Sequence, residues 1–111
     1  MSKAESHDRN VVISRLRKQA PSDAVRLTLH AHQEMVNENI SYDEVREVLL
    51  DARVVESYPD HKRGACCLAC RSTSRNRFIH VVCTTSLEIA VVITTYEPKP
   101  PKWATPFERG T

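Results

Sequence analysis

The sequence predicts an α+β domain in which two or three N-terminal helices pack on one face of a small antiparallel sheet of about four strands. Three observations indicate this class. Apolar residues recur with helical spacing up to about residue 52, alternate from residue 54 onward, and the alternating segments are joined by short polar turns. Four prolines between residues 98 and 106 then predict an extended, proline-rich C-terminal tail, because proline cannot donate to a sheet ladder.

The first 24 residues are a polar extension, and residues 25–111 are expected to form a single domain. Within the extension, "NVVISRLRKQ" has Val12, Leu16 and Gln19 at helical spacing, which predicts a short helix. Asn10 is a suitable N-cap for it.

Two further helices are predicted before the strands. In "TLHAHQEMVNENI", Thr28 is the expected N-cap, and the apolar face consists of Leu29, His32, Met35 and Val36. This spacing puts His32 in the core or at its boundary. In "SYDEVREVLLDA", Ser41 and Glu44 have the spacing of a capping box, and the apolar stripe consists of Val45, Val48, Leu49 and Ala52.

Four strands are predicted from "VVESYP", "ACCLACR", "RFIHVVCTT" and "EIAVVITTY". Alternation along the last two sorts their side chains by face. The aliphatic face expected to pack against the helices contains Ile79, Val81, Ile89, Val91 and Ile93. His80 and Tyr96 then share the opposite, more open face, provided that the two strands pair without a bulge.

Charge is unevenly distributed along the chain. Residues 1–55 hold eight lysines and arginines against nine acidic residues, whereas residues 56–111 hold eight against five. Between Asp60 and Glu88 there are five cations and no acidic residue: Lys62, Arg63, Arg71, Arg75 and Arg77. Clustered basic residues are typical of surfaces that bind polyanions such as nucleic acids. They are equally typical of solvent-exposed hairpin turns.

The chain is expected to be cytoplasmic. "IAVVI" is its longest aliphatic run, and "MSKAESHDRN" lacks the apolar core of a signal peptide. In that compartment the four cysteines, Cys66, Cys67, Cys70 and Cys83, are expected to be free thiols or metal ligands rather than disulfides.

A histidine and a tyrosine on an open sheet face, beside a cationic hairpin, are typical of metal-free RNA cleavage. That reaction needs a base near the 2′-hydroxyl, an acid near the 5′ oxygen and positive charge near the phosphate. Histidine suits proton transfer near neutral pH, tyrosine donates a proton or stacks on a base, and arginine and lysine bind phosphate. A lone strand histidine such as His80 also has a purely structural interpretation.

The segments "LTLHAHQEM", "ISYDEVREVLLDARVVESYPD", "IHVVCTTSLEIAVVITTYEPKPPKW" and "PFERG" together resemble the domain of unknown function (DUF) 4258 family. The resemblance spans about residues 27–109. It implies a domain similar to the RelE/MqsR-like ribonucleases, and a toxin encoded beside a small zinc-finger antitoxin of the YgiT type. The positions that match the pattern are His30, His80, Tyr96, Lys102, Trp103 and Arg109. The cysteine-rich "GACCLAC" and residues 1–24 depart from it.

Two alternatives stay open. Cys67, Cys70, His80 and Cys83 are zinc-ligand types, but residues three apart on a strand face opposite ways, which also argues against thiol redox chemistry at Cys67 and Cys70. A non-catalytic module that binds RNA or protein would use the same basic hairpin and aromatic tail. Trp103 and Phe107 are expected to hold this tail against the sheet.

The sequence therefore predicts a toxin-type endoribonuclease that works without metal or cofactor and is neutralised by a cognate antitoxin. His80 is predicted to be catalytic together with His30 or Tyr96, and which of the three is acid or base stays open. RNA is predicted to contact Lys62, Arg63, Arg71, Arg75, Arg77, Lys102 and Arg109. Base specificity, ribosome dependence and oligomeric state are not specified by the sequence.

Overall fold

The computed structural model describes residues 25–51, 53–62, 64–85 and 89–110. In chain order its elements are β1 (Val25–Leu27), α3 (Leu29–Glu38), α4 (Tyr42–Leu50), β2 (Arg53–Tyr58), β3 (Cys66–Ser72), β4 (Phe78–Thr84), β5 (Ala90–Tyr96), β6 (Trp103–Thr105) and β7 (Glu108–Arg109). The predicted α+β class is confirmed. The helix predicted near residues 10–19 lies outside the described residues. Neither described helix is long and apolar enough to span a bilayer.

Five strands form one sheet in the order β1-β5-β4-β3-β2. The four strands that the sequence predicts are antiparallel neighbours, as expected. The prediction of a purely antiparallel sheet is wrong, because β1 adds a fifth strand that runs parallel to β5. Three residues are too short to leave an alternation signal, so sequence reasoning missed this strand.

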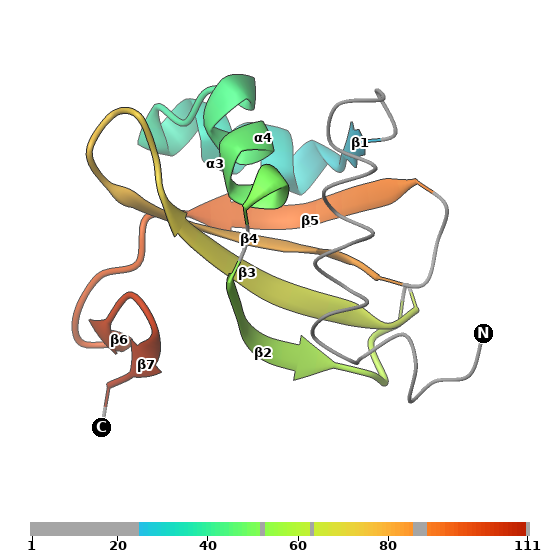
Figure 1. The fold of residues 1–111 in the computed structure, drawn as a ribbon. Coiled ribbons are helices and arrows are strands. Elements are labelled where there is room, and N and C mark those ends of the chain that lie inside the picture. Colours follow the sequence, from blue (N-terminus) through green and yellow to red (C-terminus); the bar gives the residue numbers. More distant parts are fainter. Residues whose placement is uncertain (1–24, 52, 63, 86–88, 111) are drawn as a thin grey trace.

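Both described helices lie on one face of the sheet, here called the helix face (Figure 1). Helix α3 packs on β5, and α4 packs on β3 and β4. Thr28 caps α3 as predicted, since its hydroxyl accepts from the amide of Ala31. The predicted apolar face of α3 is right for Met35, which is buried, and wrong for the other three residues: His32 is exposed, and Leu29 and Val36 are 73% and 69% exposed. Ala31 is buried in their place. Ala31 and Met35, four residues apart on the helix, are thus the side chains that α3 contributes to the core.

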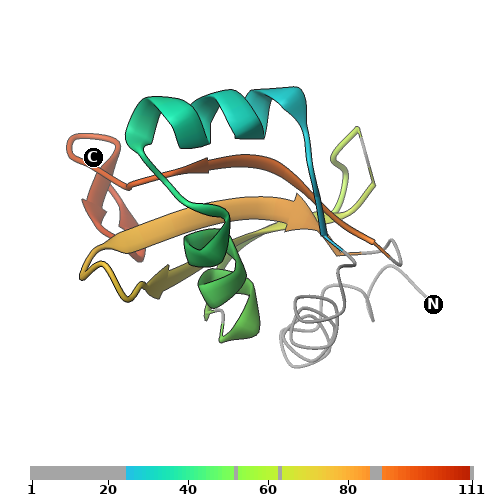
Figure 2. The ribbon, with the colours of Figure 1, turned by 90° about the horizontal axis from the view of Figure 1, so that it is seen from above.

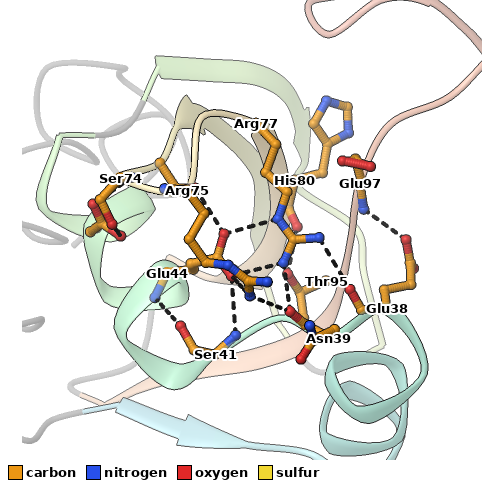
Figure 3. Close-up of polar contacts among 12 residues, drawn as sticks. Glu38, Asn39, Ser41, Glu44, Ser74, Arg75, Arg77, His80, Thr95 and Glu97 are labelled. Carbon is orange, nitrogen blue, oxygen red and sulfur yellow. Dashed lines mark hydrogen bonds and ion pairs between the residues drawn. The ribbon is translucent and has the colours of Figure 1, made fainter.

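The capping box of α4 is confirmed, and its glutamate has a second role. The amide of Ser41 donates to Oε1 of Glu44, and the amide of Glu44 donates to Oγ of Ser41. The same carboxylate is 1% exposed and accepts from both Arg75 (3.0 Å) and Arg77 (2.8 Å). Figure 3 shows the two guanidinium groups converging on it. Glu44 thus joins α4 to the turn between β3 and β4.

Strand β5 contains a bulge that changes which side chains face the helices. Val82 pairs with Thr94 and Cys83 with Val92, so Ile93 is the extra residue. Ala90 and Val92 therefore belong to the core beneath the helices, with Ile79 and Val81 of β4. The predicted helix-facing set of Ile89, Val91 and Ile93 is wrong for this reason, since the prediction assumed unbroken alternation.

The C-terminal segment is a short β6–β7 hairpin rather than an extended tail, which corrects the prediction. It lies by the sheet face opposite the helices, here called the hairpin face (Figure 1). Trp103 is 1% exposed there and packs with Cys66, Leu68 and Val82. Gly110 closes the hairpin, because its amide donates to Lys102 and a side chain at this position would collide with the carbonyl of Pro101. The expectation that Trp103 holds this segment against the sheet agrees with that packing.

The buried Glu44 predicts a specific loss of stability in acid. Hydrogen bonds from Arg77 lower the pKa of Glu44 from 4.5 to about 2, so its contribution is complete above pH 4.5 and is lost as the pH falls toward 2. This contribution is roughly 3 kcal/mol at most. Urea unfolding of Glu44→Gln should therefore show lower stability at pH 7 and a flatter pH dependence between pH 4.5 and 2.

Glu47→Gln is the matched control, because Glu47 lies on the same helix and bonds the same turn through Ser74. It should retain the wild-type pH dependence over this window. Equal acid sensitivity of wild type and Glu44→Gln would contradict the assignment.

Candidate functional site

A pocket of about 530 Å³ lies between α3, the end of β5 and the segment that leads into the hairpin. Its lining from α3 is His30, Glu34 and Glu38, from the end of β5 is Thr94, Tyr96 and Glu97, and from the following segment is Lys99, Lys102 and Trp103. We call it the α3–β5 pocket. It brings together three predicted site residues, His30, Tyr96 and Lys102.

The pocket exists because β1 is shorter than β5. β1 pairs only with Ala90–Val92, and in the described part of the chain no strand continues that edge. Helix α3 runs alongside it instead, in the same direction as β5 (Figure 2). Thr28 bonds to the carbonyls of Val92 and Ile93, and ten residues later Glu38 accepts from the amide of Glu97 at 3.0 Å. Between these two anchors, His30 and Glu34 line the pocket, whereas Ala31 and Met35 are buried in the core.

His30, Glu34 and Glu38 are spaced four residues apart, so they lie on one side of α3. Lys99 and Lys102 line the pocket from the other chain segment. The pocket therefore has two glutamates on its α3 side, and its other side carries Lys102 together with Lys99, whose ammonium lies 4.0 Å from the Glu97 carboxylate. Glu34, Glu38, Glu97 and Lys99 were missed by sequence reasoning. The i, i+4, i+8 spacing on α3 was the available signal, and it was overlooked because the apolar face of this helix was misassigned.

Tyr96 and His80 are cross-strand partners, and the prediction that they share a face agrees with this register. Nδ1 of His80 lies 3.2 Å from the hydroxyl of Tyr96, and Nε2 lies 2.6 Å from the carbonyl of Pro106. A carbonyl only accepts, so Nε2 carries the hydrogen. In the neutral ring Nδ1 is then the acceptor, and the Tyr96 hydroxyl donates to it.

The prediction that His80 lies on an open face is wrong, because the hairpin covers it. His80 is fully buried, and its ring meets the indole of Trp103 edge-on, with centroids 4.5 Å apart. Burial lowers the pKa of His80, partly offset by its bond to Pro106. Burial also raises the pKa of Tyr96, which reaches the pocket. Tyr96 is thus available to a ligand, whereas His80 acts only through its neighbours.

Arg109 holds the hairpin against β2. Its guanidinium donates to both carboxylate oxygens of Glu56, at 2.7 and 2.8 Å, and it lies 4.8 Å from the centre of the Trp103 ring. The hydroxyl of Tyr58 donates to the same carboxylate at 2.6 Å. The bond from Arg109 is the main cause that lowers the pKa of Glu56. Arg109 is therefore an internal partner of the fold rather than a free cation.

The predicted RNA-contacting cations do not form one surface. Arg75 and Arg77 bind Glu44 and the carbonyl of Asn39, on the helix side of the sheet (Figure 3). Asn39 ends α3 with φ 53°, a conformation that asparagine tolerates better than most residues. Arg71 lies 3.5 Å from Asp51 and donates to the carbonyl of Glu47.

The remaining predicted cations differ in position. Lys62 is exposed on the turn between β2 and β3, away from the residues that line the pocket. Arg63 lies outside the described residues. Lys102 lines the pocket, with its ammonium 5.4 Å from the centre of the Tyr96 ring. Of the predicted cations, Lys102 is the one that the structure places at the pocket.

All four cysteines are buried, and none of them forms a disulfide. Cys67 and Cys83 are cross-strand partners in the core beneath the helices, whereas Cys70 pairs with His80 in register. Burial raises the pKa of Cys70 to about 12. Within the described ranges, no three His, Cys, Asp or Glu side chains are grouped as metal ligands. The four residues considered as a zinc set are divided between two sheet faces.

Comparison with protein families found one match. The family model described as "Domain of unknown function (DUF4258)" matches residues 27–97, which include both helices, the whole sheet except part of β1, and Tyr96. No curated protein and no solved structure matches significantly.

The hairpin contact can be tested with the chain's one tryptophan. Arg109→Ala removes two bonds to Glu56 and the cation–π contact with Trp103. We expect Trp103 emission to move to longer wavelength and iodide quenching to increase. Glu108→Gln, an exposed change on the same strand, should leave both unchanged. Wild-type emission and quenching in Arg109→Ala would mean that apolar packing alone holds the hairpin.

Proposed function

This chain belongs to the DUF4258 family, and from that membership and the α3–β5 pocket we propose that it is a toxin-type endoribonuclease acting in the cytoplasm. Its fold is proposed to be RelE/MqsR-like. It cuts RNA without metal by 2′-hydroxyl attack and is neutralised by a cognate antitoxin, of the zinc-finger YgiT type that the family resemblance suggests.

The observation that supports this proposal is the meeting of a phenol, an imidazole and an ammonium group in one pocket. Tyr96, His30 and Lys102 come from β5, α3 and the segment before the hairpin, and all three line it. These are the proton-transfer and charge-stabilising groups that metal-free cleavage of a phosphodiester requires. The volume of about 530 Å³ falls in the range of ordinary ligand pockets.

In the proposed reaction the 2′-hydroxyl loses its proton and attacks phosphorus. A 2′-oxygen–phosphorus bond forms, the bond from phosphorus to the 5′ oxygen breaks, and the leaving oxygen takes up a proton. The products are a 2′,3′-cyclic phosphate and a free 5′-hydroxyl. Tyr96 and His30 exchange the two protons, and Lys102 neutralises charge on the phosphate. Glu34, one helical turn beyond His30, lines the same pocket.

This assignment revises the role of His80. A side chain with no exposed surface and both ring nitrogens engaged does not reach RNA. His80 is therefore a positioning residue for Tyr96 rather than a catalytic residue. Arg75, Arg77 and Arg109 are likewise withdrawn as phosphate ligands, because each is paired with a carboxylate.

A second candidate function is binding without cleavage, to RNA or to a protein. The three carboxylates that line the pocket favour it, because Glu34, Glu38 and Glu97 repel a phosphate. Cleavage by the purified protein separates the two candidates.

The test uses purified full-length protein, a mixed-sequence single-stranded RNA and excess EDTA. We expect cleavage products with a cyclic phosphate and a 5′-hydroxyl. His30→Ala should slow cleavage by about 10²-fold, the usual effect of losing a general acid or base. Tyr96→Phe should cost about 10-fold or more, which corresponds to about 1.4 kcal/mol in the barrier.

Lys62→Ala is the matched control for Lys102→Ala, because both remove one exposed lysine but only Lys102 lines the pocket. The control should cut at the wild-type rate, and Lys102→Ala should be slower. Wild-type protein that binds RNA but leaves it intact would replace the endoribonuclease proposal by the binding module.

A further inference from the structure

The Tyr96 hydroxyl is held from within the protein. It donates its hydrogen to Nδ1 of His80, and His80 in turn donates from Nε2 to the carbonyl of Pro106. The 2.6 Å contact to a carbonyl fixes the tautomer, because the opposite tautomer would place two acceptors against each other. The hydrogen of Tyr96 therefore points into the protein, and lone pairs of its oxygen are left for the pocket.

This orientation decides which way a proton can move. The Tyr96 hydroxyl already donates its hydrogen to His80, so its oxygen can only accept a hydrogen bond from a substrate hydroxyl. It can take up a second hydrogen only if it passes the first one to its own acceptor. The imidazole of His80 is the only basic group bonded to that hydroxyl among the described residues.

We propose that Tyr96 and His80 form a proton relay, in which Tyr96 accepts the 2′-hydroxyl proton while handing its own proton to Nδ1 of His80. The proposal rests on the proposed function and assigns the base of that reaction to the pair. His30 is then the acid that protonates the leaving 5′ oxygen.

The relay balances without any added reagent. As the 2′-oxygen–phosphorus bond forms, one proton moves from the 2′-hydroxyl to the Tyr96 oxygen and another moves from that oxygen to Nδ1. His80 is then an imidazolium that still donates from Nε2 to Pro106. His30 gives its proton to the 5′ oxygen as the phosphorus–oxygen bond breaks. Return of the proton from His80 through Tyr96 to solvent, and reprotonation of His30, restore the starting state.

The surroundings of His80 fit an imidazole that is neutral in the free protein and becomes protonated only during the proposed reaction. Burial disfavours its charged form and so lowers its pKa, as do the cations Lys102 before the hairpin and Arg109 on β7. Glu56 on β2 and the carbonyl of Pro106 act in the opposite direction and stabilise the imidazolium. Cys70 faces it from β3, with a pKa raised to about 12, so this thiol stays neutral.

Trp103 supplies an independent observation. Its Nε1 is buried and forms no hydrogen bond of good geometry within the described part of the chain. It nevertheless lies close enough to Tyr96 to act on the phenol as a hydrogen-bond donor, which lowers the pKa of Tyr96 against the larger effect of burial. A donor held near the phenol without a well-formed bond has little value for a resting tyrosine. It has a clear use for an oxygen that carries partial negative charge during transfer.

The decisive variant is His80→Asn. An asparagine oxygen can replace Nδ1 as acceptor for the Tyr96 hydroxyl, but it cannot take the proton. We expect a folded protein with a cleavage rate about 10²-fold lower. The wild-type rate should fall in acid as His80 becomes protonated, and His80→Asn should lack this limb. Tyr96→Phe combined with His80→Asn should cost no more than the larger single change, because both remove one relay.

Cys70→Ala is the matched control, since it alters packing against His80 from the neighbouring strand without removing a relay group. It should cut at the wild-type rate. Nitrogen-15 NMR of the wild-type protein provides a readout that needs no variant and no activity. We expect His80 to be protonated at Nε2 alone near neutral pH.

The outcomes separate the two proposals. Failure of wild-type protein to cut any RNA overturns the proposed function and the relay with it. Cleavage by wild type that His80→Asn retains in full overturns the relay alone. An Nδ1-protonated tautomer of His80 in the NMR spectrum also overturns it, even if His80→Asn does not fold.

Discussion

The structure depends on covering the sheet face that carries no described helix. Helices α3 and α4 both pack on one side, which leaves Cys66, Leu68 and Val82 on the other. Trp103 packs over them and is held by Arg109 on its outer side. Burial of one large aromatic side chain is worth a few kcal/mol. The same packing buries His80 and brings Lys102 to the edge of the sheet beside Tyr96.

The shortest ion pairs among the described residues join different helices, strands and turns of the fold. Glu44 connects α4 to the β3–β4 turn through two arginines, and Glu56 connects β2 to β7 through Arg109. Buried or bidentate pairs of this kind specify which segments meet, because leaving either partner alone in the interior is costly. The basic second half of the chain therefore does not form one cationic surface, because Arg75, Arg77 and Arg109 are paired with carboxylates. The charged residues that line the pocket are Glu34 and Glu38 on α3, and Glu97, Lys99 and Lys102 on the opposite chain segment.

Local sequence signals predicted much of the fold. Ser41 and Glu44 specified the start of α4, and the pairing of the last two long strands placed His80 beside Tyr96. The sequence-based predictions were wrong where the position or burial of a side chain depends on a residue far away in the chain. Nothing near Arg77 in the sequence indicates that its partner lies 33 residues earlier, and the bulge at Ile93 leaves no mark on the alternation. The exposure of His80 was misjudged because its cover, Trp103, follows the prolines that suggested an open tail.

The parallel pairing of β1 with β5 has a consequence for how the protein is made. Thr28 and Ile93 are bonded although 65 residues separate them, and the pocket also needs Lys102 and Trp103. A chain emerging from the ribosome can form α4 and the β3–β4 hairpin early, because their contacts are local. The edge of the sheet, and with it the α3–β5 pocket, can close only after Lys102 and Trp103 have been synthesised. Nascent chains that have not yet reached Trp103 therefore lack a complete site, even when α4 and the β3–β4 hairpin have already formed.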